Sequence, residues 1–162
     1  MTQLPRIATP KTVLFLCTGN YYRSRHAEAV FNHHAMLLRL DWRAVSRGLR
    51  LELGVFNFGP ISRSTVQRLT ALGIPHLEYL RPPMDVSEND LTAANLVVAL
   101  KEAEHRPMLA RRFPAWETRV EFWHVHDVDC AGPEWTLPHI EHEVGQLVSR
   151  LSNARYQSCN GG

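Results

Sequence analysis

The sequence has few cysteines and no long apolar run. Its three cysteines, Cys17, Cys130 and Cys159, are an odd number and lie far apart, which excludes a disulfide framework and favours a reducing, cytoplasmic setting. The apolar run at residues 13–17 is too short for a membrane span or for the core of a signal peptide. We therefore expect a soluble, unexported protein with no membrane partner.

The sequence also lacks a large excess of charge of either sign. It contains 18 Lys and Arg against 16 Asp and Glu, a formal net charge of +2, which argues against a nucleic-acid partner. With 162 residues and 44% hydrophobic content, the chain can build one core but hardly two. We predict one domain over residues 11–152, with flexible tails at 1–10 and 153–162.

Short apolar or β-branched runs alternate with longer amphipathic ones, without an internal repeat. The first and third of the short runs are apolar nearly throughout, which is typical of a parallel sheet covered by helices on both faces. The predicted fold class is therefore a single-domain, three-layer α/β sandwich. The pattern predicts strands at 12–17, 43–46, 96–100 and 120–125 and helices at 23–40, 60–72, 91–94, 101–112 and 138–151.

The segment VLFLCTGNYYRSRHAE places Cys17 at the end of the first strand and Arg23 at the start of a helix. A loop between a parallel strand and a helix points free backbone N–H groups at one spot, which binds anions. The same field favours a thiolate, so we predict that Cys17 is a nucleophile. The fork of Arg23 can hold two oxygens of a tetrahedral oxyanion. Gly19 and Asn20 tolerate the positive φ of a tight turn.

The alternative is that Cys17 is a small core residue and Arg23 a solvated residue of the first helical turn. A bare Cys-x5-Arg pattern occurs often by chance. Here a buried strand precedes the pattern and an amphipathic helix follows it, which is the structural context that a catalytic loop needs. The context favours the functional interpretation.

At the residues CTGNYYRS, the chain resembles the low-molecular-weight protein tyrosine phosphatase family, whose signature is Cys-x-Gly-Asn-x-Cys-Arg-Ser near the N-terminus. The resemblance extends more loosely over residues 12 to about 152, with AVSRG at the end of the second strand and LTAANLVVAL around the third. It implies a flavodoxin-like, four-stranded parallel sheet of order 2-1-3-4.

The resemblance also implies a phosphomonoester hydrolase, specifically a protein-tyrosine phosphatase, that forms a phosphocysteine on Cys17 and needs no cofactor. Arg23 would bind the phosphoryl group, Ser24 would stabilise the thiolate, and Asn20 and Ser46 would hold the loop in shape. Its partners would be a phosphotyrosine protein or a small aryl phosphoester, with phosphate as product and inhibitor. The implied phosphate-binding residues are Thr18, Gly19, Asn20, Tyr21, Tyr22, Arg23 and Ser24.

Hydrolysis also needs a general acid, because the leaving alkoxide or phenolate must be protonated. In the family, an aspartate of an Asp-Pro pair in the loop after the fourth strand has this role. Here the loop reads FWHVHDVDCAGPEW and contains Asp127 and Asp129. We favour Asp127, which falls where the strand leaves the sheet, although Val128 replaces the proline. Asp129 is the alternative acid, and whichever aspartate is not the acid would cap the loop.

The same loop raises the possibility of a metal site, because His124 and His126 lie beside Asp127. In an extended strand, the two histidines would share one face while Asp127 points to the other, which argues against a common metal. His139 and His142 lie one helical turn apart without a third ligand. We therefore expect no metal.

Several residues depart from the family pattern. Tyr22 stands where many members have a second cysteine, so a disulfide within the loop is excluded. Arg25, Arg47 and Lys101 replace proline, alanine and aspartate, which predicts a more basic mouth. Three aromatic residues are candidates either for the walls of the site or for the core: Phe56, Phe58 and Trp135.

Two other functions remain open. A thiol-dependent arsenate reductase of the same fold would use Cys17 against a phosphate-shaped oxyanion, but it needs recycling thiols. No closely spaced cysteine pair follows the loop, and only Cys130 and Cys159 could substitute. A non-catalytic module that binds phosphate or a phosphoprotein would keep the loop and lack a well-placed acid.

Overall fold

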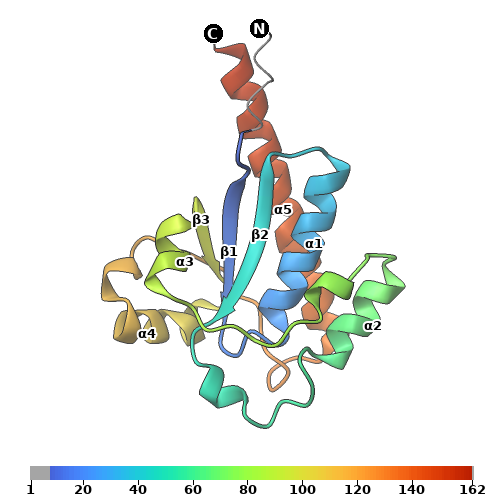
Figure 1. The fold of residues 1–162 in the computed structure, drawn as a ribbon, viewed down its shortest axis with the longest axis vertical. Helices are drawn as coiled ribbons and strands as arrows, with labels where there is room; N and C mark the ends of the chain where they lie inside the picture. Colours follow the sequence, from blue (N-terminus) through green and yellow to red (C-terminus); the bar gives the residue numbers. More distant parts are fainter. Residues whose placement is uncertain (1–7, 162) are drawn as a thin grey trace, which may run out of the picture.

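The computed structural model describes residues 8–161 and contains a parallel sheet between two layers of helices (Figure 1). The sheet has four strands in the order β2-β1-β3-β4, and every neighbouring pair is parallel. The predicted fold class and strand order are therefore confirmed. The strands are β1 (Lys11–Cys17), β2 (Trp42–Gly48), β3 (Leu96–Ala99) and β4 (Glu121–Phe122).

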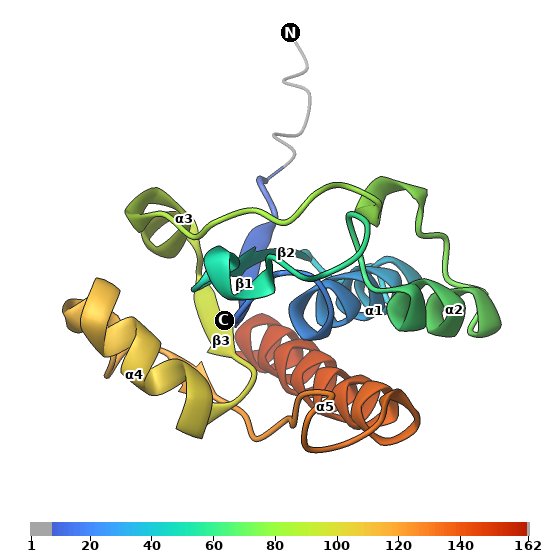
Figure 2. The ribbon, with the colours of Figure 1, turned by 90° about the horizontal axis from the view of Figure 1, so that it is seen from below.

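Helices cover both faces of the sheet, as the apolar strands require. Helices α1 and α5 lie on one face and α3 and α4 on the other, while α2 lies beside α1 (Figure 2). The helices are α1 (Arg23–Leu37), α2 (Arg63–Ala71), α3 (Glu88–Ala93), α4 (Glu102–Arg112) and α5 (Pro133–Asn160). Short 3-10 turns lie at η1 (Leu51–Gly54), η2 (Leu77–Tyr79) and η3 (Pro114–Trp116).

The central strand β1 divides the core into two clusters. Val13 and Phe15 belong to the cluster under α1 and α5, whereas Leu14 and Leu16 belong to the cluster under α3 and α4. All four side chains are fully buried. Successive side chains of a strand point to opposite faces, so an apolar residue at every position is stable only where both faces are covered.

The fourth strand is shorter than the predicted range 120–125. Only Glu121 and Phe122 pair with β3, although the backbone N–H groups of Trp123 and Val125 still donate to Ala99 and Leu100. The chain thus runs on beside β3 and carries the following loop to the carboxyl end of the sheet.

Helix α5 differs most from its predicted range of 138–151. It begins at Pro133, because proline suits the first position of a helix, where its missing N–H has no partner in any case. Pro138 lies inside the helix, where the burial of Thr136 and Leu137 outweighs the missing hydrogen bond. The helix continues to Asn160, so most of the segment predicted as a flexible tail at 153–162 is helical.

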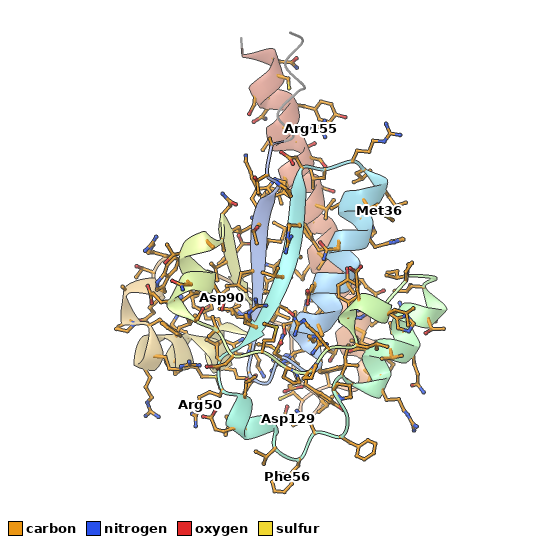
Figure 3. All side chains as sticks on the ribbon, in the orientation of Figure 1. Met36, Arg50, Phe56, Asp90, Asp129 and Arg155 are labelled. Atoms are coloured by element: carbon orange, nitrogen blue, oxygen red, sulfur yellow. The ribbon has the colours of Figure 1, made fainter. Side chains whose placement is uncertain are left out.

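The N-terminal tail predicted at 1–10 lies largely outside the described residues, and residues 8–10 have no regular structure. Within the described chain, no helix has both the length and the apolar character that a membrane crossing requires. The carboxyl ends of the strands mark one end of the molecule. Phe56 and Asp129 lie beyond that end, whereas Arg155 lies near the opposite end of α5 (Figure 3).

Candidate active site

The loop between β1 and α1 surrounds the sulfur of Cys17. Asn20 adopts the left-handed conformation in this loop, with φ of 48°, whereas Gly19 does not, so the expected positive φ falls on Asn20 alone. Cys17 is buried, and its sulfur lies 2.9 Å from Oγ of Ser24 in the first turn of α1. Nδ2 of Asn20 donates to that same Oγ at 2.9 Å, which leaves the Ser24 hydroxyl hydrogen to point at the sulfur. Cys17, Ser24 and Asn20 thus form one continuous hydrogen-bonded chain.

The side-chain amide of Asn20 ties the loop to two other segments. Its Nδ2 also donates to Oγ of Ser46 in β2 at 2.9 Å. Its Oδ1 accepts from the backbone N–H of Met84 at 2.9 Å and from Nη1 of Arg81 at 3.1 Å. Both ends of the amide are thus satisfied, and the loop is fixed against β2 and the segment at 81–84.

Arg25 lies beneath the loop and not at its mouth, where the sequence suggested a basic residue. Its side chain is fully buried and donates to four backbone carbonyl groups, those of Asn20, Pro60, Tyr79 and Arg81. Burial and, to a smaller extent, the nearby charge of Arg81 lower the pKa of Arg25 to about 10. Sequence reasoning missed this role, since the acceptors belong to the backbone of distant segments.

Arg23 is the positive group beside the sulfur, and it is almost fully buried. Its Nη1 and Nη2 donate to the two carboxylate oxygens of Glu104 at 3.0 and 2.7 Å. Nη2 also donates to Oδ2 of Asp127 at 3.0 Å, and Nη1 to the carbonyl oxygen of Val125 at 3.3 Å. Burial alone would lower the pKa of Arg23, but the bond to Glu104 and the nearby negative groups raise it above its ordinary value. The guanidinium is therefore permanently charged.

Glu104, in the first turn of α4, was not predicted as a site residue. Besides Arg23, it accepts a hydrogen bond from the hydroxyl of Thr18 in the loop, and its Oε1 lies 3.4 Å from Nε2 of buried His105. Burial would raise the pKa of Glu104, but hydrogen bonds from His105, Arg23 and Thr18 hold it far below its ordinary value. The sequence signal is the acidic stretch EAEH at 102–105, shortly after the third strand and at the end of the sheet where Cys17 also lies.

The two candidate acids differ in position. Asp127 reaches Arg23 with Oδ2, and its Oδ1 accepts from the backbone N–H of Val128 at 2.8 Å. Asp129 is exposed and does not line the pocket that contains Cys17. The geometry brings Asp127, and not Asp129, to the pocket that contains Cys17 and Arg23.

The pocket above Cys17 is small, with a volume of about 140 Å³. That volume is below the range of pockets that hold large cofactors and suits a phosphoryl group with a small substituent. The floor and walls come from the loop at 17–23, from the segment at 57–62 and from the loop after β4, which contains Asp127 and Val128. The lining residues are Cys17, Gly19, Tyr21, Tyr22, Arg23, Asn57, Ser62, Asp127 and Val128.

The family model described as low molecular weight phosphotyrosine protein phosphatase matches residues 12–155. The chain belongs to this family. Among curated proteins, it is similar to an arsenate reductase from Bacillus cereus, with 28% identity over 143 residues that cover 88% of this chain and 94% of the relative. An arsenate reductase from Bacillus anthracis matches with the same identity and coverage.

Solved structures agree with the family assignment. A low molecular weight protein tyrosine phosphatase from T. tengcongensis matches with a TM-score of 0.70 and 27% identity, over 89% of this chain and 99% of that one. YfkJ from Bacillus subtilis matches in fold, with a TM-score of 0.76 and 24% identity, over 91% and 98% of the two chains.

In this member of the low molecular weight phosphatase family, two exposed phenylalanines, Phe56 and Phe58, flank Asn57, which lines the pocket. Phe56 and Phe58 are 97% and 94% exposed, and Trp135 is 72% exposed, so none of these three candidates is a core residue. The hydroxyl of Tyr21 donates to the carbonyl oxygen of Phe58 at 2.6 Å. That bond fixes the segment with the two phenylalanines against a wall of the pocket.

The remaining candidate ligands and thiols of this family member lie apart. Among residues 8–161, no group of three or more His, Cys, Asp and Glu side chains is arranged to hold a metal ion. Cys130 is exposed in the loop between β4 and α5, and its sulfur lies 3.7 Å from Nζ of Lys101. Cys159 lies in the last turn of α5, beside the first residues of β1 and β2, at the end of the sheet opposite Cys17.

Proposed function

We propose that the chain is a phosphomonoester hydrolase that acts through a phosphocysteine on Cys17. The observation that carries the proposal is one small pocket lined by the Cys17 sulfur, the Arg23 guanidinium and the Asp127 carboxyl group. A nucleophile, a fixed positive charge and a proton donor are the groups that cleavage of a phosphoester needs.

In the first step, the sulfur attacks phosphorus and the bond from phosphorus to the leaving oxygen breaks. Asp127, protonated, gives its proton to that oxygen. In the second step, Asp127 accepts a proton from water, the water oxygen bonds to phosphorus, and the sulfur leaves as a thiolate with release of phosphate. The backbone N–H groups of residues 18–24, with Arg23, would hold the phosphoryl oxygens in both steps.

Arrival of the phosphoryl group would also free the acid. In the present structure, Oδ2 of Asp127 occupies one hydrogen of Nη2 of Arg23. A phosphoryl oxygen that binds the same hydrogen displaces the carboxyl group toward the mouth of the pocket, where the leaving oxygen lies. Binding of substrate and delivery of the acid are then one event.

The substrate that we propose is an aryl phosphoester, and specifically phosphotyrosine in a protein, whose ring would lie against the aromatic residues beside the pocket. The support is the aromatic wall of Tyr21 and Tyr22, together with the exposed Phe56 and Phe58 on either side of the lining residue Asn57. Aromatic side chains at the mouth of a pocket stabilise a bound ring by stacking, worth about 0.5–1.5 kcal/mol for each pair. Phosphate would be both the product and a competitive inhibitor.

The test is hydrolysis of an aryl phosphate between about pH 5 and 7 with a chelator present, the range in which a carboxylic acid and a thiolate can coexist. We expect Cys17→Ser to abolish turnover and Asp127→Asn to lower kcat by about 10²- to 10⁴-fold through loss of the acid. Asp129→Asn is the matched control, since it removes a carboxylate from the same loop outside the pocket, and should leave kcat within about twofold.

If Asp129→Asn gives the large loss and Asp127→Asn does not, Asp129 is the acid. If the unmodified protein binds phosphate but hydrolyses no aryl phosphate, the phosphatase proposal is wrong and a phosphate-binding module is favoured.

Arsenate reduction is the second candidate, because the curated relatives at 28% identity are named arsenate reductases. Cys17 would bond to arsenate with loss of water, and a second thiol would then attack the Cys17 sulfur, leaving a disulfide and arsenite. The second thiol has to be Cys130 or an external dithiol, since Cys159 lies at the opposite end of the sheet. Arsenite release coupled to oxidation of a thioredoxin-type dithiol would support this activity, and its absence alongside aryl phosphate hydrolysis would exclude it.

A further inference from the structure

We propose that Glu104 is the positioning residue that turns one edge of the Arg23 guanidinium toward the phosphoryl group. The inference rests on the proposed function of the Cys17 loop. It concerns a residue outside the segment that resembles the family signature, because Glu104 lies in α4, 81 positions along the chain from Arg23.

The geometry of the guanidinium carries the argument. A guanidinium has two edges that can donate a pair of parallel hydrogen bonds to an oxyanion, the Nη1/Nη2 edge and the Nε/Nη2 edge. Glu104 occupies the first edge, at 3.0 and 2.7 Å. The second hydrogen of Nη1 goes to the carbonyl oxygen of Val125. The Nε/Nη2 edge remains for a phosphoryl group, which displaces Oδ2 of Asp127 from Nη2 on the side where Asp127 lines the pocket.

Glu104 is itself held in place from two sides. The hydroxyl of Thr18 donates to it from the loop. Nδ1 of His105 accepts from the backbone N–H of Lys101 at 3.0 Å, so the hydrogen of the neutral ring sits on Nε2, which faces Glu104. The carboxylate of Glu104 is thus a negative charge held in one orientation. Because Arg23 donates to both of its oxygens, the guanidinium is held in one orientation as well.

A second observation separates Glu104 from the other charges at this end of α4. Lys101 directly precedes α4, and its Nζ lies 3.7 Å from the sulfur of Cys130. Glu102 accepts two hydrogen bonds from Arg106 of the same helix. Glu104 is therefore the α4 carboxylate that reaches Arg23 in the described structure.

Two opposite effects follow for catalysis and for ground-state binding. Phosphoryl transfer depends on orientation and electrostatics, so a guanidinium that is free to rotate lowers kcat. Glu104 also cancels part of the Arg23 charge, so its removal strengthens the attraction of Arg23 for a phosphate dianion. An interaction that weakens ground-state binding while it fixes the transition-state geometry raises kcat.

The experiment compares Glu104→Gln with the unmodified chain. We expect kcat for an aryl phosphate to fall by about 10- to 100-fold, because the amide leaves the guanidinium free to rotate. We expect the dissociation constant of inorganic phosphate, measured by calorimetry at one fixed pH, to fall by about 3- to 10-fold. Glu102→Gln is the matched control, since it removes the same charge from the same turn of α4 without touching Arg23. It should change neither quantity by more than about twofold.

Each outcome decides the proposal. A kcat within about twofold of the unmodified chain, or a phosphate dissociation constant that rises, overturns the role of Glu104. If Glu104→Gln does not fold, Glu104→Asp replaces it. That variant keeps the charge but shortens the reach, so kcat should fall by about 3- to 10-fold with unchanged phosphate affinity, and an undiminished kcat overturns the proposal.

The calorimetric measurement needs no turnover, which separates this inference from the proposed function. If the unmodified chain binds phosphate without hydrolysing aryl phosphates, the proposed function fails and the change in phosphate affinity alone decides about Glu104. If the unmodified chain binds no phosphate, the proposed function and the role of Glu104 are both wrong.

Discussion

At the scale of single residues, the site depends on an arginine that never meets solvent. Arg25 bonds to the carbonyl oxygen of Asn20 in the loop and to three carbonyl groups from the segments at 60 and 79–81. Buried carbonyl groups are costly without a donor, at about 1–3 kcal/mol each. Arg25 therefore satisfies several otherwise unpaired groups at once and fixes the shape of the loop from below.

We expect Arg25→Met to lower the free energy of unfolding by about 3–5 kcal/mol, since methionine has a similar length but no donor. Denaturation with urea gives this quantity. Arg63→Met, at the exposed start of α2, is the matched control and should change the free energy by less than about 0.5 kcal/mol. A loss below about 1 kcal/mol for Arg25→Met would mean that water or relaxed backbone replaces the lost donors.

At the scale of elements, the last helix has a packed part and an unpacked part. Its buried residues end at Val148, and Leu151 is partly buried against the core, whereas residues 153–160 are exposed. A hydrogen bond from Nη1 of Arg155 to the carbonyl oxygen of Arg39 is an exposed contact of the unpacked part. Helices in proteins gain most of their stability from burial of an apolar face, so the last turns contribute little.

We expect removal of residues 153–162 to lower the free energy of unfolding by less than about 1 kcal/mol and to leave kcat within about twofold, because no core side chain is lost. Removal of residues 146–162 is the control, since it deletes Leu147 and Val148 from the core and should abolish cooperative unfolding. A loss above about 2 kcal/mol for the shorter deletion would place the domain boundary beyond residue 152.

At the scale of the whole molecule, two buried histidines make stability depend on pH. His26 and His105 are both fully buried, and burial lowers the pKa of each below its ordinary value despite the carboxylates beside them. The folded chain thus binds a proton less readily than the unfolded chain, in which histidine titrates near about 6.5. The free energy of unfolding must therefore fall as pH drops below about 6.5, by up to about 1.4 kcal/mol per pH unit for each histidine.

We expect urea denaturation between about pH 8 and 5 to show this loss, and His26→Gln to reduce the slope below about pH 6.5 because glutamine does not titrate. His124→Gln, at an exposed position, is the control and should keep the slope of the unmodified chain. If the free energy of unfolding has the same dependence on pH in the His26→Gln variant and in the unmodified chain, His26 binds its proton as readily in the folded chain as in the unfolded one.

Glu141 acts in a lower range of pH. Burial would raise its pKa, but hydrogen bonds from His26 and Arg68 lower it to about 2. The stability that it contributes is present above its unfolded pKa of about 4.3 and disappears as pH falls toward 2. The titration of Glu141 therefore lies below the range of about pH 8 to 5 in which His26 is tested.

The sequence predicted the arrangement around the first strand, since a buried strand, a turn and an amphipathic helix are local patterns. Cys17 and Arg23 were predicted from that pattern, and Asp127 was predicted from the resemblance to the family, whose acid lies in the loop after the fourth strand. Glu104 and Arg25 could not be predicted in the same way. Their partners are a side chain far along the chain and backbone carbonyl groups, and neither leaves a periodic signal in the sequence.

Element boundaries also depended on tertiary contacts. The fourth strand pairs with β3 over Glu121 and Phe122 only, and the hydrogen bonds of Trp123 and Val125 continue beyond that pairing. Helix α5 includes Pro138, since the surrounding turns are buried against the core. Propensity alone placed the start of the helix at that proline.

The side-chain amide of Asn20 joins the loop to Ser46 and to the segment at 81–84, and this has a consequence for the order of folding. Contacts between residues 26 and 64 positions apart form only after the intervening helices have docked, since closing long loops costs chain entropy. During synthesis, Cys17 leaves the ribosome early, before the segments that hold Asn20 and Ser24 in place exist. The loop around Cys17 is therefore assembled only when the topology of the chain is complete.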